Sequence, residues 1–287
     1  MLAGHPVRAG RAEGLSPAIH PGADPHRMST SVGDVRAFVR DARSATDVAT
    51  GALWGMLLLR PALAVAFQAT VALAFVAGGS SDPWRAAADW WLAWFAGVSV
   101  VNLFVLRWLL HQEGSRLRDL YRLDRISGKG DLRWVALALL VAGPIAMLPN
   151  LLIGQALWGS SQAGADLSFR AIPVVAAAVL VVAFPVIHAA AELPTYFGYV
   201  MPRLRVAHGW QWRALAVTGT VLALQHVALP LLFDWRFVAW RALMFLPFAL
   251  WMGFVILRRP TTLPYLVVAH ALLDVSLPLL VLFASLS

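Results

Sequence analysis

Long apolar stretches dominate the chain and leave few folds open to it. A helix that crosses the ~30 Å hydrocarbon core of a bilayer needs about 20 apolar residues. Only 13% of the 287 residues are charged, about half the share of a typical soluble domain. Seven stretches predict transmembrane helices: Ala49–Val76, Trp90–Leu110, Trp134–Leu157, Ile172–Val200, Ala214–Phe233, Phe237–Leu257 and Leu263–Leu286. The sequence therefore predicts an all-α, polytopic helical membrane bundle over residues 49–287.

The stretch Ile172–Val200 is too long for one simple span. It contains Pro185 and Pro194, and a proline inside a helix removes a backbone hydrogen bond and clashes with the preceding turn. We expect a kink at these prolines, or a second half that is re-entrant or broken. The predicted total is therefore seven to eight transmembrane helices.

Residues 1–48 form a separate polar segment, which is rich in Gly, Pro, His and Arg at its start. The segment has no apolar core of the kind found in signal peptides. We expect it to lie in the cytoplasm and to be disordered, or to form a short amphipathic helix at Ser29–Thr46 on the membrane surface.

Basic residues are unevenly distributed among the loops, which predicts the orientation of the chain. The loops His111–Arg133, Pro202–Arg213 and Arg258–Arg259 are rich in Arg, whereas Gly78–Asp89 and Trp158–Arg170 are poor in it. Cytoplasmic loops carry the excess of Lys and Arg, so we predict an integral protein of a bacterial cytoplasmic membrane with a cytoplasmic N-terminus. These loops explain the net charge of +8, and we expect lipid rather than nucleic acid as a partner.

The ionisable residues inside the apolar stretches include Glu192, His226, His270 and Asp274. A charge at the centre of a bilayer costs about 2.5 kcal/mol or more, so such residues face a bundle interior and mark functional sites. His188 and Glu192 are four residues apart, as are His270 and Asp274, so each pair shares a helix face. We predict that Glu192, His226 and His270 converge around one polar cavity, roughly 3–5 Å apart.

These residue types suit hydrolysis. Glu192 could take a proton from a water that His226 and His270 bind. Asp274 could orient His270 or help to stabilise an oxyanion. The chain has no cysteine, so a metal would need His and carboxylate ligands: Glu192, His226 and His270 are the candidates, with His188 as a further one. Two imidazoles and one carboxylate suit zinc with an open fourth position, while a metal-free mechanism stays open.

The order of these residues resembles the CPBP family of intramembrane proteases, named for CAAX proteases and bacteriocin-processing enzymes. The first motif of that family is Glu-Glu-x-x-x-Arg, often followed by Gly-Tyr-x-x-Pro-Arg-Leu, and the segment Gly198–Leu204 matches this continuation. Counting back places Glu192 on the first glutamate. His226 matches the histidine of the second motif, Phe-x-x-x-His. His270 and Asp274 match the third, His-x-x-x-Asn/Asp.

The resemblance covers residues 172–278 and implies a peptidase whose first-motif glutamate activates water, in a reaction usually called metal-dependent. The chain departs from the pattern at Leu193, Phe197 and Leu222, which replace the second Glu, the Arg and the Phe of the family motifs. Losing the Glu and the Arg together removes an ion pair as a unit. We expect Leu193 and Phe197 to pack apolarly and to leave Glu192 without a cationic neighbour.

The sequence therefore predicts an intramembrane peptidase of the CPBP type. It would cleave a membrane-associated or prenylated peptide with a water activated by Glu192, and its cavity would open towards the Pro202–Arg213 loop. A second hypothesis, supported by Leu193 and Phe197, is a non-catalytic family member that acts as a membrane scaffold or bacteriocin-immunity factor. A third is a proton-coupled transporter whose relay uses the same His and carboxylate residues.

Other polar residues in the apolar stretches have a structural interpretation. Asn102, Asn150 and Gln155 are expected to form hydrogen bonds between helices. Arg241 is expected to snorkel to the membrane surface or to pair structurally.

Overall fold

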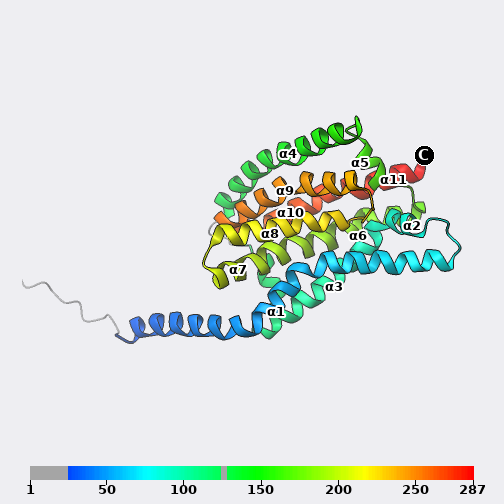
Figure 1. The fold of residues 1–287 in the computed structure, drawn as a ribbon. Helices are drawn as coiled ribbons and strands as arrows, with labels where there is room; N and C mark the ends of the chain where they lie inside the picture. The colour runs from blue at the N-terminus through cyan, green and yellow to red at the C-terminus, as the bar shows by residue number, and fades with distance from the viewer. Residues whose placement is uncertain (1–24, 124–127) are drawn as a thin grey trace, which may run out of the picture. The chain divides into compact units, whose positions relative to one another are not determined.

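The computed structural model describes residues 25–123 and 128–287, with side chains from residue 51 on except that of His208. These residues form no β-strand, and the predicted all-α class is confirmed for them. The α-helices are α1 (Pro25–Ala77), α2 (Pro83–Asp89), α3 (Trp91–Gln112), α4 (Gly128–Trp158), α5 (Ala163–Ser168), α6 (Val174–Leu193), α7 (Met201–His208), α8 (Gln211–Gln225), α9 (Trp235–Arg258), α10 (Leu263–Asp274) and α11 (Ser276–Leu286) (Figure 1). Short 3-10 turns span Leu117–Tyr121, His226–Ala228 and Pro260–Thr262, and a π-helix spans Pro194–Val200.

The chain divides into two compact units, Met1–Asp47 and Val48–Ser287. In the first unit the backbone is helical from Pro25 onward. Residues 1–24 and the side chains of Ser29–Thr46, on which the predicted disorder and the predicted amphipathic face depend, lie outside the described part of the chain. The second unit contains all the candidate site residues.

The second unit is a bundle in which helices pack side by side. α6 packs against α3, α10 and α11, and α9 packs against α4 and α8 (Figure 1). Leu57 of α1, Leu106 of α3, Leu193 of α6 and Val255 of α9 meet in one apolar core and are at most 2% exposed. This packing holds α6 between its neighbours, so that its side chains meet those of several other helices.

Six segments are long and apolar enough to cross a membrane: Gly51–Ala77, Trp91–Gln112, Gly128–Trp158, Val174–Ala207, Trp235–Arg258 and Pro260–Leu286. They make the chain an integral membrane protein and match six of the seven predicted stretches. The prediction for Ala214–Phe233 is wrong in its second half, because α8 ends at Gln225. Pro230 lacks an N–H and disfavours helical backbone at the residue before it. Asp234 then caps the start of α9 with its side chain.

The long stretch Ile172–Val200 remains helical instead of turning back into the membrane. Pro185 lies inside α6, and at Pro194 the backbone passes into the π-helix and then into α7. Pro194 has no N–H to give to the carbonyl of Ala190, and the hydroxyl of Tyr121 donates to that oxygen at 2.7 Å. The predicted break is therefore a local change of helical winding, and the re-entrant alternative is wrong.

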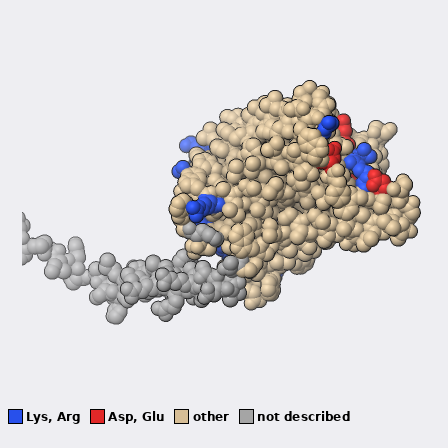
Figure 2. All heavy atoms as spheres, viewed as in Figure 1, with Lys and Arg blue, Asp and Glu red and all other residues tan. Residues whose placement is uncertain are grey.

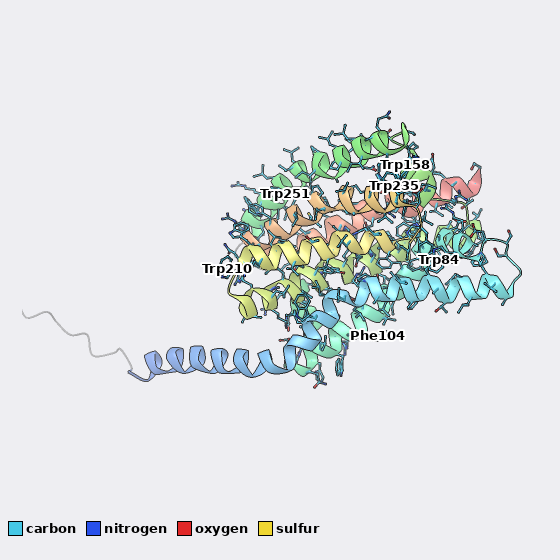
Figure 3. The ribbon with its side chains drawn as sticks, viewed as in Figure 1. Trp84, Phe104, Trp158, Trp210, Trp235 and Trp251 are labelled. Atoms are coloured by element: carbon cyan, nitrogen blue, oxygen red, sulfur yellow. The ribbon has the colours of Figure 1, made fainter. Side chains whose placement is uncertain are left out.

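Large apolar side chains cover much of the outside of the second unit, as lipid contact requires. Exposed examples include Leu73, Phe104, Leu140, Val175 and Phe283. Figure 3 shows Trp84, Trp158 and Trp235 towards one end of the bundle and Trp210 at the other. Tryptophan at both ends is typical of the aromatic belts at membrane–water interfaces.

Charged side chains on the face shown in Figure 2 gather at the two ends of the bundle, with an uncharged surface between them. The end near α7 shows Lys and Arg, whereas the opposite end shows both signs. The sequence near α7 supplies Arg203, Arg205 and Arg213, and α2 with its flanking residue supplies Asp82, Arg85 and Asp89. This distribution matches the loop asymmetry from which the orientation was predicted.

Candidate functional site

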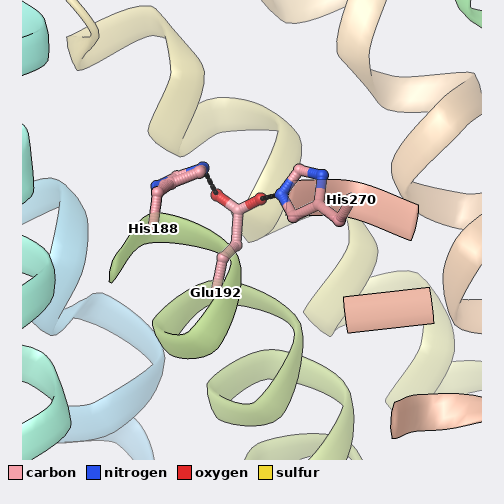
Figure 4. Close-up of side chains that lie close together, drawn as sticks. All are labelled: His188, Glu192 and His270. Carbon is pink, nitrogen blue, oxygen red and sulfur yellow. Dashed lines mark hydrogen bonds and ion pairs between the residues drawn. The ribbon is translucent and has the colours of Figure 1, made fainter. Parts of the chain in front are cut away.

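The structure brings the predicted site residues together around Glu192, which is 2% exposed. His188 lies one turn before Glu192 on α6, and its Nε2 is 3.4 Å from Oε1. Nε2 of His270, on α10, is 3.0 Å from Oε2. Nε2 of His226, in the 3-10 turn after α8, is 3.9 Å from Oε1. Figure 4 shows His188 and His270 on either side of the carboxylate.

Asp274 approaches this group without forming a hydrogen bond to it. Its Oδ2 lies 3.5 Å from Nε2 of His270 and 3.9 Å from Nε2 of His188. That oxygen is buried and has no hydrogen-bond partner among the described residues. Nε2 of His270 is closer to Glu192 than to Asp274, so Glu192 accepts its hydrogen bond and Asp274 adds a longer ion pair from one turn further along α10.

Sequence reasoning missed Arg60 and Gln225, which complete the cluster. Arg60 is 0% exposed; its Nε donates to Oε1 of Gln225 at 2.9 Å, and its Nη2 donates to Nδ1 of His188 at 3.1 Å. Nη2 of Arg60 also lies 3.8 Å from Oε1 of Glu192. The same Oε1 accepts a hydrogen bond from Nε2 of Gln225. The signal was an arginine inside the first apolar stretch, where an ionisable residue marks a functional site.

The expectation that Glu192 lacks a cationic neighbour is therefore wrong. Leu193 and Phe197 do pack into the apolar core, at 2% and 1% exposed. The ring of Phe197 lies against Gly253 of α9, where a methyl group would come within 2.6 Å of it. Arg60, from α1, supplies a positive charge beside Glu192.

The hydrogen bonds fix the ring protons of two histidines. A guanidinium only donates, so Nδ1 of His188 accepts from Arg60, and neutral His188 carries its proton on Nε2, towards Glu192. A carbonyl only accepts, so Nδ1 of His226, 2.8 Å from the carbonyl oxygen of Leu222, carries its proton. Nε2 of His226 is then an acceptor. His188 thus gives Glu192 a donor, while His226 offers a lone pair.

The cluster lines a cavity of about 400 Å³ inside the bundle. The cavity reaches Gln162, Ala165 and Phe169 in and around α5, and among the described residues none from Pro202–Arg213 lines it. In Figure 1, α5 and α7 lie at opposite ends of the bundle. The expected opening towards the Pro202–Arg213 loop is therefore wrong, because the cavity extends from the C-terminal half of α6 towards α5, at the other end of the bundle.

His188, Glu192 and His270 could hold a metal ion, since one ligand atom from each lies within 4.8 Å of the others. His188 thus takes the place that we expected for His226. Two imidazole nitrogens and one carboxylate oxygen form a donor set that zinc accepts. However, Nε2 of His188 can bind a metal only without its proton, and the hydrogen bond from Arg60 to Nδ1 places the proton there.

The Gly198–Leu204 segment, which carries the closest match to the family pattern, does not touch the cavity. The hydroxyl of Tyr199 donates to Oε1 of Glu113 at 2.8 Å, and Arg203 pairs with the same carboxylate. A Cβ on Gly198 would lie 2.9 Å from a methyl carbon of Leu263. These residues therefore anchor the π-helix and α7 to α3 and α10.

The residues with a structural interpretation are placed as follows. Asn102 donates to Oγ1 of Thr195 at 2.7 Å, and Oδ1 of Asn150 accepts from Nε1 of Trp240 at 3.0 Å. Both bonds join separate elements, as expected. Gln155 donates to a carbonyl in its own turn, so the expectation of a bond between helices is wrong for it.

A scan of protein-family models finds no match to this chain, and searches of curated proteins and of solved structures find none either. The resemblance to the CPBP family therefore depends on the order and spacing of residues.

Proposed function

We propose that this chain is an intramembrane peptidase of the CPBP type in which Glu192 activates water. The observation that carries the proposal is the buried carboxylate of Glu192 facing Nε2 of His226 at 3.9 Å, on the wall of an internal cavity. Both atoms accept hydrogen bonds. A water that donates one hydrogen to each is held and polarised between them.

The reaction follows from these positions. The water oxygen attacks the carbonyl carbon of the peptide bond while Glu192 takes one of its protons. The C–N bond then breaks, and the proton passes from Glu192 to the leaving amine. Negative charge develops on the carbonyl oxygen, and donors already in place stabilise it best. Asp274 in its protonated form, with an Oδ2 that has no hydrogen-bond partner among the described residues, lines the cavity and is our candidate donor.

Arg60 acts as a positioning residue in this mechanism. It holds His188 and Gln225 by hydrogen bonds, and each of these side chains contacts Oε1 of Glu192. Tyr196 adds a second donor to Oε1 of Gln225, at 2.9 Å, which fixes the amide with its nitrogen towards Glu192. The carboxylate therefore keeps one orientation in the cavity.

A metal-dependent version uses the same residues. Zinc held by His188, Glu192 and His270 would polarise the substrate carbonyl and lower the pKa of a bound water. Glu192 could not easily be both a ligand and the base. The contact between Arg60 and His188 therefore favours the metal-free version.

We further infer seven crossings, with α8 as the shortest. α8 has 15 residues, but it packs along α9, which is long enough to cross. The Arg-rich end near α7 would face the cytoplasm under the positive-inside rule. The cavity then extends towards the opposite side of the membrane, so a membrane-associated or prenylated substrate would enter from that side or from within the bilayer.

One observation favours a second candidate, a non-catalytic scaffold. Oε1 of Glu192 has Gln225, His188 and Arg60 around it, and Oε2 has His270. A carboxylate with so many donors can be a purely structural group, because buried charges need such partners.

Hydrolysis can be tested with the purified chain in liposomes. A library of peptides from digested membrane proteins is added in ¹⁸O-labelled water, and mass spectrometry searches for new C-termini. A peptidase gives new termini that carry ¹⁸O in their carboxylates. If no peptide is cut at any concentration of protein, the hydrolytic proposal fails and the scaffold is favoured.

A further inference from the structure

Arg241 of α9 is 4% exposed, so the expectation that it snorkels to the membrane surface is wrong. Its Nη2 donates to the carbonyl oxygen of Leu229. Its Nε is buried and has no hydrogen-bond partner in the described part of the chain. No described carboxylate forms an ion pair with Arg241. Of the structural pairing that we expected, the described residues show only the hydrogen bond to the neutral carbonyl of Leu229.

Aromatic rings enclose this guanidinium. Its central carbon lies 5.3–5.7 Å from the ring centroids of Trp91, Phe237, Trp240 and Phe245. Cation–π contacts stabilise a cation without neutralising it. The surroundings therefore keep the charge in place but supply no negative charge to balance it.

Arg241 also lines the cavity that contains Glu192. Phe245 connects the two places, because His226 stacks on its ring with centroids 3.7 Å apart and Arg241 lies over the same ring. An arginine remains charged in proteins, and a buried charge without a partner is strongly unfavourable. An anion that enters the cavity would remove this penalty.

We propose that Arg241 is the binding site for a carboxylate group of the ligand that occupies the cavity. A carboxylate carries one negative charge and two coplanar oxygens, which match the single charge and the planar fork of a guanidinium. A phosphate dianion would leave one charge unbalanced among the aromatic rings. The carboxylate could be a chain terminus or an acidic side chain, and both sources have the same chemistry. The site is inferred from Arg241 and its surroundings, so it stands apart from the proposed hydrolysis.

The test uses thermal unfolding of the purified full chain in detergent, followed by tryptophan fluorescence. N-acetyl-leucine provides a terminal carboxylate, N-acetyl-isoglutamine provides only a side-chain carboxylate, and N-acetyl-leucinamide is the neutral match. We expect a saturable rise in Tm with at least one of the two acids and none with the amide. The acid that acts identifies the source of the carboxylate.

Three variants locate the effect. Arg241→Gln should weaken the apparent affinity for the active acid by at least about tenfold, because it removes one partner of a buried charge pair. Arg241→Lys keeps the positive charge but lacks the planar guanidinium, so it should weaken the apparent affinity by an intermediate amount. This variant replaces Arg241→Gln in the test if the Gln variant does not fold. Arg236→Gln changes an arginine at the start of the same helix, stacked on Trp235, and should leave the affinity unchanged.

Several outcomes would overturn the proposal. The first is an equal change in Tm with the acids and with the amide. The second is an apparent affinity for the active acid that is unchanged in both Arg241 variants. The third is a rise in Tm with inorganic phosphate or phosphatidylglycerol vesicles when neither acid raises it. The last outcome would assign the site to a phosphate group instead.

Discussion

Arg60 and Arg241, the two buried arginines among the described residues of the membrane bundle, lie in contrasting surroundings. Arg60 is 0% exposed and contacts Gln225, His188 and Glu192. Arg241 is 4% exposed and donates to one carbonyl, with aromatic rings around it. Both side chains are near the same cavity, yet only Arg60 has a carboxylate beside it. Arg60 therefore orients the side chains around Glu192, whereas Arg241 has no balancing charge and is our proposed binding site for a ligand carboxylate.

The largest effect is expected at Arg60. Arg60→Met removes the guanidinium beside Glu192 and leaves a buried carboxylate without its cation. Breaking a buried ion pair in this way lowers the free energy of unfolding by about 3–5 kcal/mol. Thermal or denaturant unfolding in detergent should detect that loss. Arg203→Met is the control at a more exposed pair: the Arg203 and Glu113 side chains are 27% and 25% exposed, and we expect a smaller loss than at Arg60 because solvent screens the pair.

A double variant sharpens this test. Adding Glu192→Gln to Arg60→Met removes the stranded charge, so the double variant should be more stable than Arg60→Met alone. Additive losses would mean that the two side chains do not interact, against the 3.8 Å contact.

The next effect concerns Leu193 and Phe197, which stand where the CPBP motif has Glu and Arg. If Arg60 replaces the arginine of the family motif, then Leu193→Glu with Phe197→Arg gains nothing. The Phe197 ring fills the space beside Gly253, and disturbing such a packed contact costs about 1–3 kcal/mol. We expect a lower unfolding midpoint than in the parent chain. A more stable double variant would show that Arg60 does not fill this role.

Arg241 should respond less than Arg60 when no ligand is present. Arg241→Met strands the carbonyl of Leu229, which costs about 1–3 kcal/mol, but it also removes an unbalanced buried charge. These terms oppose each other, so the net change should be about 1 kcal/mol or less. The same unfolding assay applies. A loss as large as that of Arg60→Met would mark Arg241 as structural and erase the contrast.

The smallest effect lies outside the membrane spans, at Tyr121. Burial of its hydroxyl raises its pKa to about 12, above the ordinary value of about 10. The protonated form therefore favours folding, so this stabilisation is complete below pH ~10 and is lost as the pH rises through 12. Tm measured from pH 9 to 12 should fall less in Tyr121→Phe than in the parent. Identical slopes would refute the link.

Local patterns predicted much of the fold. Apolar length and composition located six membrane helices, and the four-residue spacing of His188 and Glu192 placed both on one face of α6. The end of α8 was missed, because the stretch stays apolar after Gln225 while the backbone is turned by Pro230 and capped at Asp234. Apolar composition alone does not distinguish a helix from the turn that follows it.

The site was predicted only in part, because its partners are distant in sequence. Arg60 and Gln225 are 165 residues apart, and no local spacing connects them. The same holds for the direction of the cavity, which depends on how α5, α6 and α9 pack. An arginine inside an apolar stretch could be recognised as unusual, but the sequence did not reveal that Glu192 was its neighbour.

The most direct test compares the parent chain with Glu192→Gln in the same liposomes and with the same peptide library. Removing a general base should slow formation of new termini by about 10²–10⁴-fold, while Glu113→Gln, at the exposed pair with Arg203, should leave the rate unchanged. Retained cleavage in Glu192→Gln would contradict the assignment of Glu192 as the base that activates water.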